Sequence, residues 1–276
     1  MMLKSKSVSN ETESRQNKQW SGFIPVEDTK LFTKDTGGSG QAIIYLNGSY
    51  ANQKHWKKVV KELGSNYRHI LYDERARGNS KKSKDYSFDA CLRDLTAIIE
   101  HRHIEKPILV GWSYGAILAV HWAKRYPKGA SGIVAVDSAV PYGLTGDESK
   151  ARIYKLFNRI KWILPFIAPF GLAARMTAKQ HAEINIEINE ISAKLEPILL
   201  TIGIPVRYLL ASGASRGGEE HEFKAMRESL TPLLTKNLNL KVDVQVESNH
   251  EKILSKDYIA IANSIDKLAN ELNHLK

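Results

Sequence analysis

The sequence has little of what disulfide-bonded, membrane-spanning or metal-binding proteins require. Its 276 residues contain one cysteine, Cys91, so no intramolecular disulfide can form. No apolar run reaches the about eighteen residues that a membrane-spanning helix needs. Residues 1–20 are polar and charged and lack the apolar segment of a secretory signal. None of the nine histidines has metal-ligand spacing with a partner. We therefore expect a cytoplasmic protein without a bound metal.

The excess of basic residues does not by itself indicate a nucleic-acid partner. The formal net charge is +10, but the lysines and arginines are spread along the chain, and no zinc-finger, RRM-like or helix-turn-helix signature accompanies them. Hydrophobic residues make up 42% and charged residues 25%, as in an ordinary globular protein with a sizeable core. We expect a small-molecule substrate and no nucleic acid. The sequence leaves the oligomeric state open.

Short apolar runs alternate with helical patterns along most of the chain. Residues 20–36 form two short apolar stretches separated by polar residues, which predicts a β-hairpin. Mainly apolar runs at 42–46, 69–72, 107–110, 132–136 and 205–210 have the length of strands buried on both faces, and residues 241–246 are expected to form one more such strand. Helical spacing separates several of them, and Ser87 is a candidate N-cap for one such helix. This alternation predicts an α/β fold with a mostly parallel central sheet covered by helices on both faces.

The alternation stops between residues 138 and 203, where the patterns are mainly helical. We expect a tail at residues 1–19, a core domain at 20–137 and 204–276, and a helical cap insertion at 138–203 over one edge of the sheet. Residues 184–188 also alternate as a strand would, although a helix is favoured there. Arg152, Lys155 and Arg159 form a basic stripe, which favours a solvated amphipathic helix over a face for acidic substrates or a membrane surface.

The most informative stretch is Gly111-Trp112-Ser113-Tyr114-Gly115, which lies between a predicted strand and a predicted helix. In this context G-x-S-x-G is typical of a nucleophile elbow, a sharp turn that presents a serine at the end of a strand. The flanking glycines permit close packing and strained backbone angles. We therefore predict Ser113 as a nucleophile.

Taken together, four markers in order make residues of about 20–272 resemble the α/β-hydrolase superfamily, in the branch with a small helical cap after strand six. Asn47-Gly48-Ser49 follows the first long strand, where this family usually has His-Gly-x. Asp73-Glu74-Arg75-Ala76-Arg77-Gly78-Asn79-Ser80 resembles the family's D-x-R-G-x-G-x-S turn, with Ala76 in place of a glycine. The elbow comes next, and His250 follows the last predicted strand. The resemblance implies an α/β-hydrolase fold and a serine hydrolase.

Within that resemblance, His250 is the expected base for Ser113, because a serine hydroxyl needs an adjacent base to become a nucleophile. The acid that orients the histidine is less well defined, since the family's usual position for it corresponds to Arg216 here. Asp137, at the end of the strand before, is favoured. Glu219 and Glu220 are the alternatives, and a dyad without an acid stays open.

The backbone N–H groups of Ser49 and Tyr114 are the expected oxyanion donors. Asp73 and Arg75 are expected to hold the turn after the fourth strand. Tyr50, Trp112, Tyr142, Trp162 and Phe166 either line an apolar substrate pocket or pack in the core and cap.

The resulting expectation is hydrolysis of small carboxylic esters, thioesters or lactones through an acyl-enzyme, without a cofactor. Carbon–carbon bond hydrolysis, acyl transfer and perhydrolysis use the same kind of site and stay open. So does a ligand sensor or signalling protein that does not turn over. The resemblance argues against haloalkane dehalogenases and epoxide hydrolases, which in this superfamily have an aspartate at the elbow.

Overall fold

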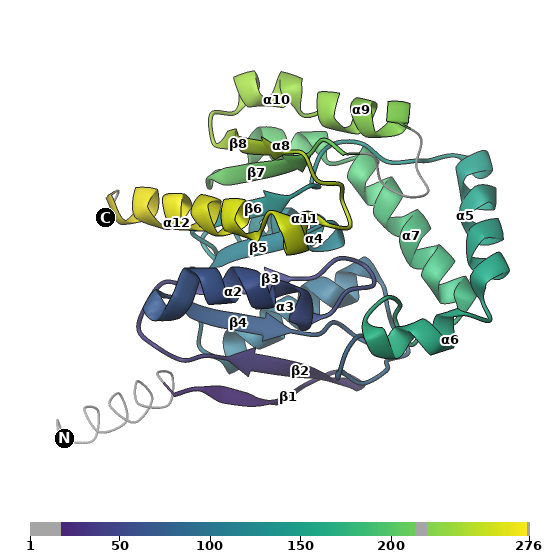
Figure 1. The fold of residues 1–276 in the computed structure, drawn as a ribbon, viewed down its shortest axis with the longest axis horizontal. Helices are drawn as coiled ribbons and strands as arrows, with labels where there is room; N and C mark the ends of the chain where they lie inside the picture. The colour runs from purple at the N-terminus through teal and green to yellow at the C-terminus, as the bar shows by residue number, and fades with distance from the viewer. Residues whose placement is uncertain (1–17, 214–219, 275–276) are drawn as a thin grey trace.

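The computed structural model describes residues 18–213 and 220–274, which form one eight-stranded sheet with helices on both faces (Figure 1). The tail expected at 1–19 lies almost wholly outside these residues. The strands are β1 (Trp20–Val26), β2 (Thr29–Asp35), β3 (Ala42–Leu46), β4 (Arg68–Tyr72), β5 (Ile108–Trp112), β6 (Gly132–Val136), β7 (Val206–Ala211) and β8 (Leu240–Val246).

The strands lie in the order β1-β2-β4-β3-β5-β6-β7-β8, and β3 to β8 are all parallel to one another. The predicted hairpin is present as β1 and β2, which pair antiparallel and extend the sheet beside β4. The α/β prediction is thus confirmed. The expectation that residues 241–246 are buried on both faces is wrong, because β8 is an edge strand whose residues 241–245 are exposed or half-buried. From β3 the chain passes to β4 on one side and then to β5 on the other, so the strand order reverses at β3. Open α/β sheets bind ligands outside the carboxyl ends of the strands at such a point.

Two layers of helices cover the sheet, because consecutive residues of each buried strand face opposite sides. Ile43 and Tyr45 pack with α2 (Lys57–Leu63) and α12 (Tyr258–His274). Ile44 and Leu46 face α3 (Phe88–His101) and α4 (Tyr114–Arg125) on the other side. The remaining helices are α5 (Asp147–Ile160), α6 (Leu164–Ile167), α7 (Ala178–Ala193), α8 (Glu196–Thr201), α9 (Glu220–Glu228), α10 (Thr231–Lys236) and α11 (Ile253–Lys256), with short 3₁₀ turns η1 (Gln53–Trp56), η2 (Gly64–Asn66) and η3 (Ala168–Phe170).

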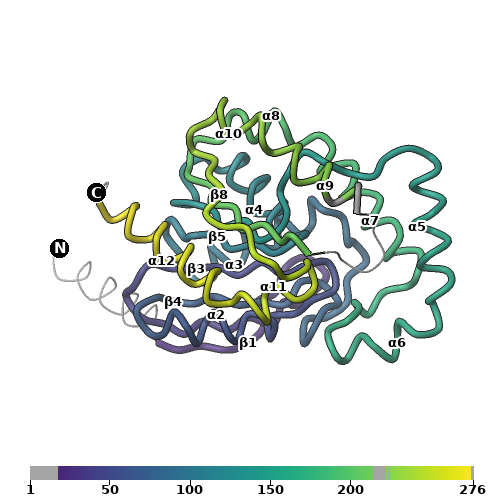
Figure 2. Tube along the Cα trace, turned by 45° about the horizontal axis from the view of Figure 1, so that its top comes forward, coloured from purple at the N-terminus to yellow at the C-terminus, as the bar shows by residue number. Residues whose placement is uncertain are grey.

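The helix-rich insertion follows β6, and α5, α6 and α7 stand together at one end of the molecule (Figures 1 and 2). They enclose a small core of their own, in which Phe157, Leu164 and Ala182 are buried. Residues 184–188 are helical, because Thr177 and Gln180 form a capping box that starts α7 ahead of them. By contrast, α8 packs against α4 and α10 on a face of the sheet. The boundary of a cap domain at residues 138–203 stays a prediction.

Of the residues that the structure describes, none lies in a helix that is both long enough and apolar enough to cross a membrane.

Candidate functional site

The turn between β5 and α4 holds Ser113 in a strained conformation. Its φ of 55° and ψ of −120° lie in a region that non-glycine residues rarely adopt, at a cost of about 1–3 kcal/mol. The turn is also tightly packed: a Cβ on Gly111 would lie 2.4 Å from the amide nitrogen of Ala116, and one on Gly115 would lie 2.3 Å from the carbonyl oxygen of Leu46. Only glycine fits at either position, so the sequence pattern of the elbow follows from contacts with β3 and α4.

Asp137 and His250 are joined by a hydrogen bond of 2.8 Å, which the His250 Nδ1–H donates to Asp137 Oδ2. Asp137 comes directly after β6 with a φ of 50° and is 2% exposed. Its other oxygen, Oδ1, accepts a hydrogen bond of 2.8 Å from the backbone N–H of Ala211 on β7. A carboxylate can only accept, so Nδ1 carries the proton of this hydrogen bond. A buried charge with both oxygens bonded in this way escapes most of the cost of burial.

Trp112 holds the loop that carries His250. Its indole N–H donates a hydrogen bond of 3.2 Å to the carbonyl oxygen of His250, and the two rings lie 5.6 Å apart between centroids. Trp112 therefore packs beside the candidate base and is not one of the residues that line the cavity at Ser113. The sequence left Trp112 open between lining a pocket and packing in the core or cap. Its place directly before Ser113 was the signal that could have assigned it to the site.

Ser113, His250, Asp137, Ser49 and Tyr114 all line one cavity of about 370 Å³ at the carboxyl ends of β3, β5 and β6. The apolar part of its wall comes from both the sheet side and the helical insertion: Ile117, Tyr142, Leu144, Ile188 and Met226. Within the described chain no hydrogen bond joins the Ser113 hydroxyl to His250. Such bonds in ligand-free sites are often long and shorten only when substrate is bound.

The backbone N–H groups of Ser49 and Tyr114 have no hydrogen-bond partner in the described part of the chain. The loop that carries Ser49 is fixed from behind, because Arg77 Nε donates a hydrogen bond of 2.9 Å to the Ser49 carbonyl oxygen. Ser49 and Tyr114 both line the cavity that also holds Ser113.

Asn47 anchors the same loop through its buried side chain. Its Nδ2 donates to the carbonyl oxygen of Tyr72 at 2.7 Å and to Glu74 Oε2 at 2.9 Å, and its Oδ1 accepts from Trp56 Nε1 at 3.0 Å. The backbone N–H of Asn47 donates to Glu74 Oε1 at 3.0 Å. Burial raises the pKa of Glu74 to about 7, since desolvation of the carboxylate outweighs the favourable effects of Arg77 and Asn47. Sequence reasoning missed Glu74, whose role depends on the asparagine that replaces the usual histidine.

The turn at residues 73–80 is structural, as predicted. Asp73 accepts hydrogen bonds from the backbone N–H groups of Gln53 and Asn79. Arg75 is fully buried and pairs with Asp94 at 2.8 Å and with Glu27 at 2.8 Å. Neither Asp73 nor Arg75 lines the cavity at Ser113.

The alternative acids lie mostly outside the part of the chain that the structure describes. Glu219 is outside the described residues, as is Arg216. Glu220 is the first residue of α9, and its side chain is outside the description as well. Glu222 lines the cavity, where its carboxylate accepts a hydrogen bond of 3.0 Å from Arg152.

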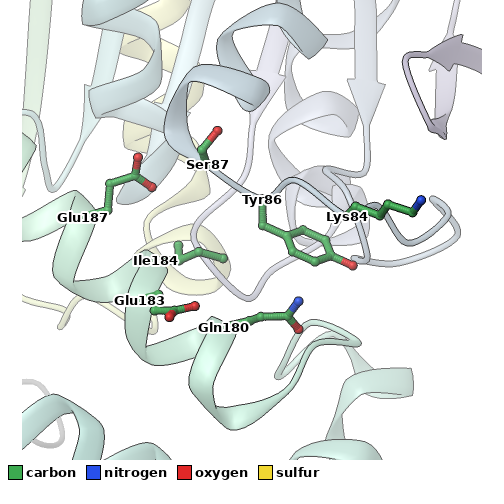
Figure 3. A pocket seen from close by; sticks show the side chains of 7 residues that line it. All are labelled: Lys84, Tyr86, Ser87, Gln180, Glu183, Ile184 and Glu187. Carbon is green, nitrogen blue, oxygen red and sulfur yellow. The ribbon is translucent and has the colours of Figure 1, made fainter.

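A second pocket of about 370 Å³ lies between residues 84–87 and α7 (Figure 3). Two of its polar side chains accept hydrogen bonds from backbone N–H groups. The Ser87 hydroxyl caps α3 by accepting from the N–H of Ala90, and Glu187 Oε2 accepts from the N–H of Phe88. Within this pocket no histidine accompanies the serine, so it lacks the groups for nucleophilic catalysis.

Comparison with known proteins agrees with this fold. The family model described as "alpha/beta hydrolase fold" matches residues 41–161. A haloalkane dehalogenase of Mesorhizobium japonicum is 28% identical over 43% of this chain and 39% of its own length. A pimeloyl-[acyl-carrier protein] methyl ester esterase of Edwardsiella ictaluri is 28% identical over 40% of this chain and 41% of its own. These matches thus span about two fifths of the curated relatives.

Among solved structures, the enol-lactonase from Burkholderia xenovorans LB400 superimposes with a TM-score of 0.70 at 14% identity, covering 90% of this chain and all of that one. At such low identity the likeness shows the fold alone. Residues 41–161 thus match the α/β-hydrolase family model, and the described chain as a whole shares that fold with the lactonase. The relatives act on different bonds, so the reaction has to be argued from the site itself.

Proposed function

We propose that the protein is a serine hydrolase that cleaves small carboxylic esters, thioesters or lactones through an acyl-enzyme. The observation that carries the proposal is the Asp137–His250 hydrogen bond at the wall of the cavity that also holds Ser113. In this arrangement His250 has the tautomer of a general base, and Ser113 has the strained turn of a nucleophile elbow.

In the first half of the reaction His250 Nε2 takes the proton of the Ser113 hydroxyl while Oγ forms a bond to the substrate carbonyl carbon. The carbonyl oxygen becomes negatively charged and accepts hydrogen bonds from the N–H groups of Ser49 and Tyr114. The intermediate collapses with cleavage of the bond to the leaving group, which receives the proton from His250. Asp137 stays ionised throughout and stabilises the imidazolium.

In the second half water attacks the acyl-enzyme. His250 takes a proton from the water, whose oxygen forms a bond to the acyl carbon. The bond between the acyl carbon and Ser113 Oγ then breaks, Oγ takes the proton back from His250, and the carboxylic acid leaves. These reaction steps use no cofactor. A serine rather than an aspartate at the elbow speaks against dehalogenase or epoxide hydrolase chemistry, even though such enzymes are among the relatives.

A fluorophosphonate probe tests the proposal. We expect it to label the wild-type chain at Ser113 and to block hydrolysis of p-nitrophenyl butyrate. Ser113→Ala should abolish both labelling and hydrolysis, whereas Ser212→Ala, at a serine after β7, should leave both unchanged. Hydrolysis that persists in Ser113→Ala would overturn the proposal, and labelling without turnover would favour the ligand sensor.

The same site is compatible with other acyl chemistry. Acyl transfer, perhydrolysis and carbon–carbon bond hydrolysis differ in what attacks or leaves, and product analysis with alcohol, hydrogen peroxide or a diketone distinguishes them from ester hydrolysis. Cytoplasmic localisation stays a prediction.

A further inference from the structure

The tip of the helical insertion exposes a cluster of large apolar side chains. Five residues in one short segment, which we call the 162–172 patch, are each more than half exposed: Trp162 (76%), Ile163 (54%), Phe166 (77%), Phe170 (77%) and Leu172 (61%). Large apolar side chains that are exposed together, rather than singly, mark binding surfaces.

The patch is not a by-product of poor packing, because the segment also contributes to a core. Leu164, Ala168 and Ala173 are buried with Phe157 beneath the patch. Trp162, Phe166 and Phe170 precede or lie on α6 and η3, and each is more than three quarters exposed. A surface helix normally carries polar residues on its exposed side. The segment is therefore apolar both toward its core and toward solvent.

Basic residues surround the patch in the sequence. Between Ser149 and Ala182 there are seven lysines and arginines and no aspartate or glutamate. In the described chain Lys155, Arg159 and Lys161 have no carboxylate within 4.0 Å. The Lys161 ammonium lies 5.3 Å from the centroid of the Trp162 ring. Lys150, Arg152 and Lys179 pair with glutamates, so the segment combines exposed aromatic rings with the positive charge of Lys155, Arg159 and Lys161, which no carboxylate of the described residues neutralises.

The patch also lies where a flat partner can reach it. In both views α5 and α6 form the rim of the molecule, at the end opposite the first described residues, and no other element of the described chain lies beyond them (Figures 1 and 2).

We propose that the 162–172 patch docks the protein on an anionic lipid surface. Helices that lie in the membrane interface carry Trp, Phe and Leu on one side and Lys and Arg beside them. The rings would enter the boundary between headgroups and acyl chains, where tryptophan is enriched. Lys155, Arg159 and Lys161 would contact the lipid phosphates, which attract basic segments. One-sided charge over the whole segment fits a continuous layer of like-charged headgroups better than a protein surface of mixed charge. The inference goes beyond the proposed function, because docking requires no catalysis.

Co-sedimentation with vesicles tests the proposal. We expect wild-type protein to sediment with vesicles of phosphatidylcholine and phosphatidylglycerol, and to stay in solution with phosphatidylcholine alone. The triple variant Trp162→Ser, Phe166→Ser, Phe170→Ser should lower the partition coefficient about tenfold or more. The matched control is Leu238→Ser with Ile259→Ser, two exposed apolar residues far from the patch in the fold, which should bind as wild type does.

The charge contribution has its own matched pair. Lys155→Gln, Arg159→Gln, Lys161→Gln should weaken binding and reduce its dependence on salt. Lys61→Gln, Lys236→Gln, Lys256→Gln removes the same charge elsewhere and should have a smaller effect. All these side chains are exposed, so unchanged circular dichroism and thermal unfolding are expected for each variant. Ser113→Ala should bind vesicles as wild type does, which separates docking from hydrolysis.

A failure is recognisable in each experiment. Absence of sedimentation with anionic vesicles, equal binding to neutral vesicles, or unchanged binding of the patch variant would each overturn the proposal. If the wild type instead sediments as a dimer in ultracentrifugation and the patch variant as a monomer, without vesicle binding, the occupant is a second copy of the chain. The lipid proposal is then wrong.

Discussion

At the residue scale, the candidate site consists of side chains whose hydrogen bonds and backbone conformation hold them in one orientation. Asp137 has one oxygen bonded to the Ala211 N–H and the other to His250 Nδ1. Ser113 and Asp137 both have positive φ values, so each is oriented by a backbone that a flexible loop would not keep. Packing in the surrounding sheet offsets the conformational strain of these two residues and so keeps their side chains in one orientation.

Replacing Asp137 by asparagine should lower kcat by roughly 10³- to 10⁴-fold with little change in KM. The amide oxygen can still accept from Ala211, but the amide N–H₂ would face His250 Nδ1 and favour the tautomer that cannot act as base. Steady-state kinetics on a short-chain ester give the measurement. Glu222→Gln removes a charge at the same cavity and serves as control, with a change below about tenfold expected. A mild effect of Asp137→Asn would transfer the role to Glu219 or Glu220.

Glu74 makes a second prediction at this scale, on stability rather than rate. Its pKa rises from 4.5 to about 7 on folding, so between these values the unfolded chain releases a proton that the folded chain retains. The free energy of unfolding should therefore fall as the pH rises through this window. From pH 5 to pH 7.5 the contribution of Glu74 to this fall is about 2 kcal/mol.

Urea unfolding of wild type and Glu74→Gln at several pH values checks this. The glutamine variant is uncharged and should lack that part of the pH dependence, whatever constant difference its altered hydrogen bonds to Asn47 introduce. Parallel curves for the two proteins would show that Glu74 does not titrate in this range.

At the scale of elements, the turn after β4 is held by backbone N–H groups that converge on Asp73. The turn leaves no room at Gly78, where φ is 45° and a Cβ would lie 2.2 Å from Asp73 Oδ2. The glycine is thus needed for the carboxylate to reach the N–H groups of Gln53 and Asn79.

Gly78→Ala should destabilise the fold by about 2–5 kcal/mol, which combines left-handed strain with overpacking against Asp73. Gly64→Ala is the matched control, because Gly64 also has a positive φ of 67° but a Cβ there would meet no atom within 4 Å. At the Gly64 ψ of −156° an alanine is strained without a clash, so this variant should cost about 1–3 kcal/mol. Thermal unfolding measures both, and equal losses would mean that the clash with Asp73 is relieved by a shift of the turn.

At the scale of the whole molecule, the cavity is bounded by residues that follow strands of the sheet, by the insertion after β6 and by α9. Ser113, Asp137 and His250 follow three strands of the sheet, while Tyr142, Leu144 and Ile188 come from the insertion. Size discrimination among substrates is therefore expected to come mainly from the insertion, and chemistry from the sheet.

Ile188→Trp should fill part of the cavity without touching the reacting groups. We expect kcat/KM for p-nitrophenyl octanoate to fall at least about tenfold relative to that for the acetate, since the longer acyl chain needs the lost volume. Ile259→Trp, on the exposed side of α12, should leave the ratio unchanged. Equal losses for both esters would place the acyl chain elsewhere in the cavity.

Much of the fold was predictable because its signals are local. Buried parallel strands are continuous apolar runs, and Ser87 caps α3 as expected. The segment at residues 184–188 was ambiguous, since its alternation fits a strand and only the longer window with its capping box favours a helix. The sequence did not decide whether Trp162 and Phe166 line a pocket or pack within the cap. Both are exposed on the outside of the insertion.

The sequence by itself determined the strand–turn–helix arrangement around residues 111–115, because a turn between a buried strand and a helix depends on neighbours within a few residues. Tertiary structure alone decided which carboxylate meets His250, since Asp137 lies 113 residues away and is brought to it by the pairing of β6 with β7 and of β7 with β8. The same holds for the cavity wall and the exposed 162–172 patch. Which side of a helix is buried depends on the elements packed against it, and no local pattern contains that information.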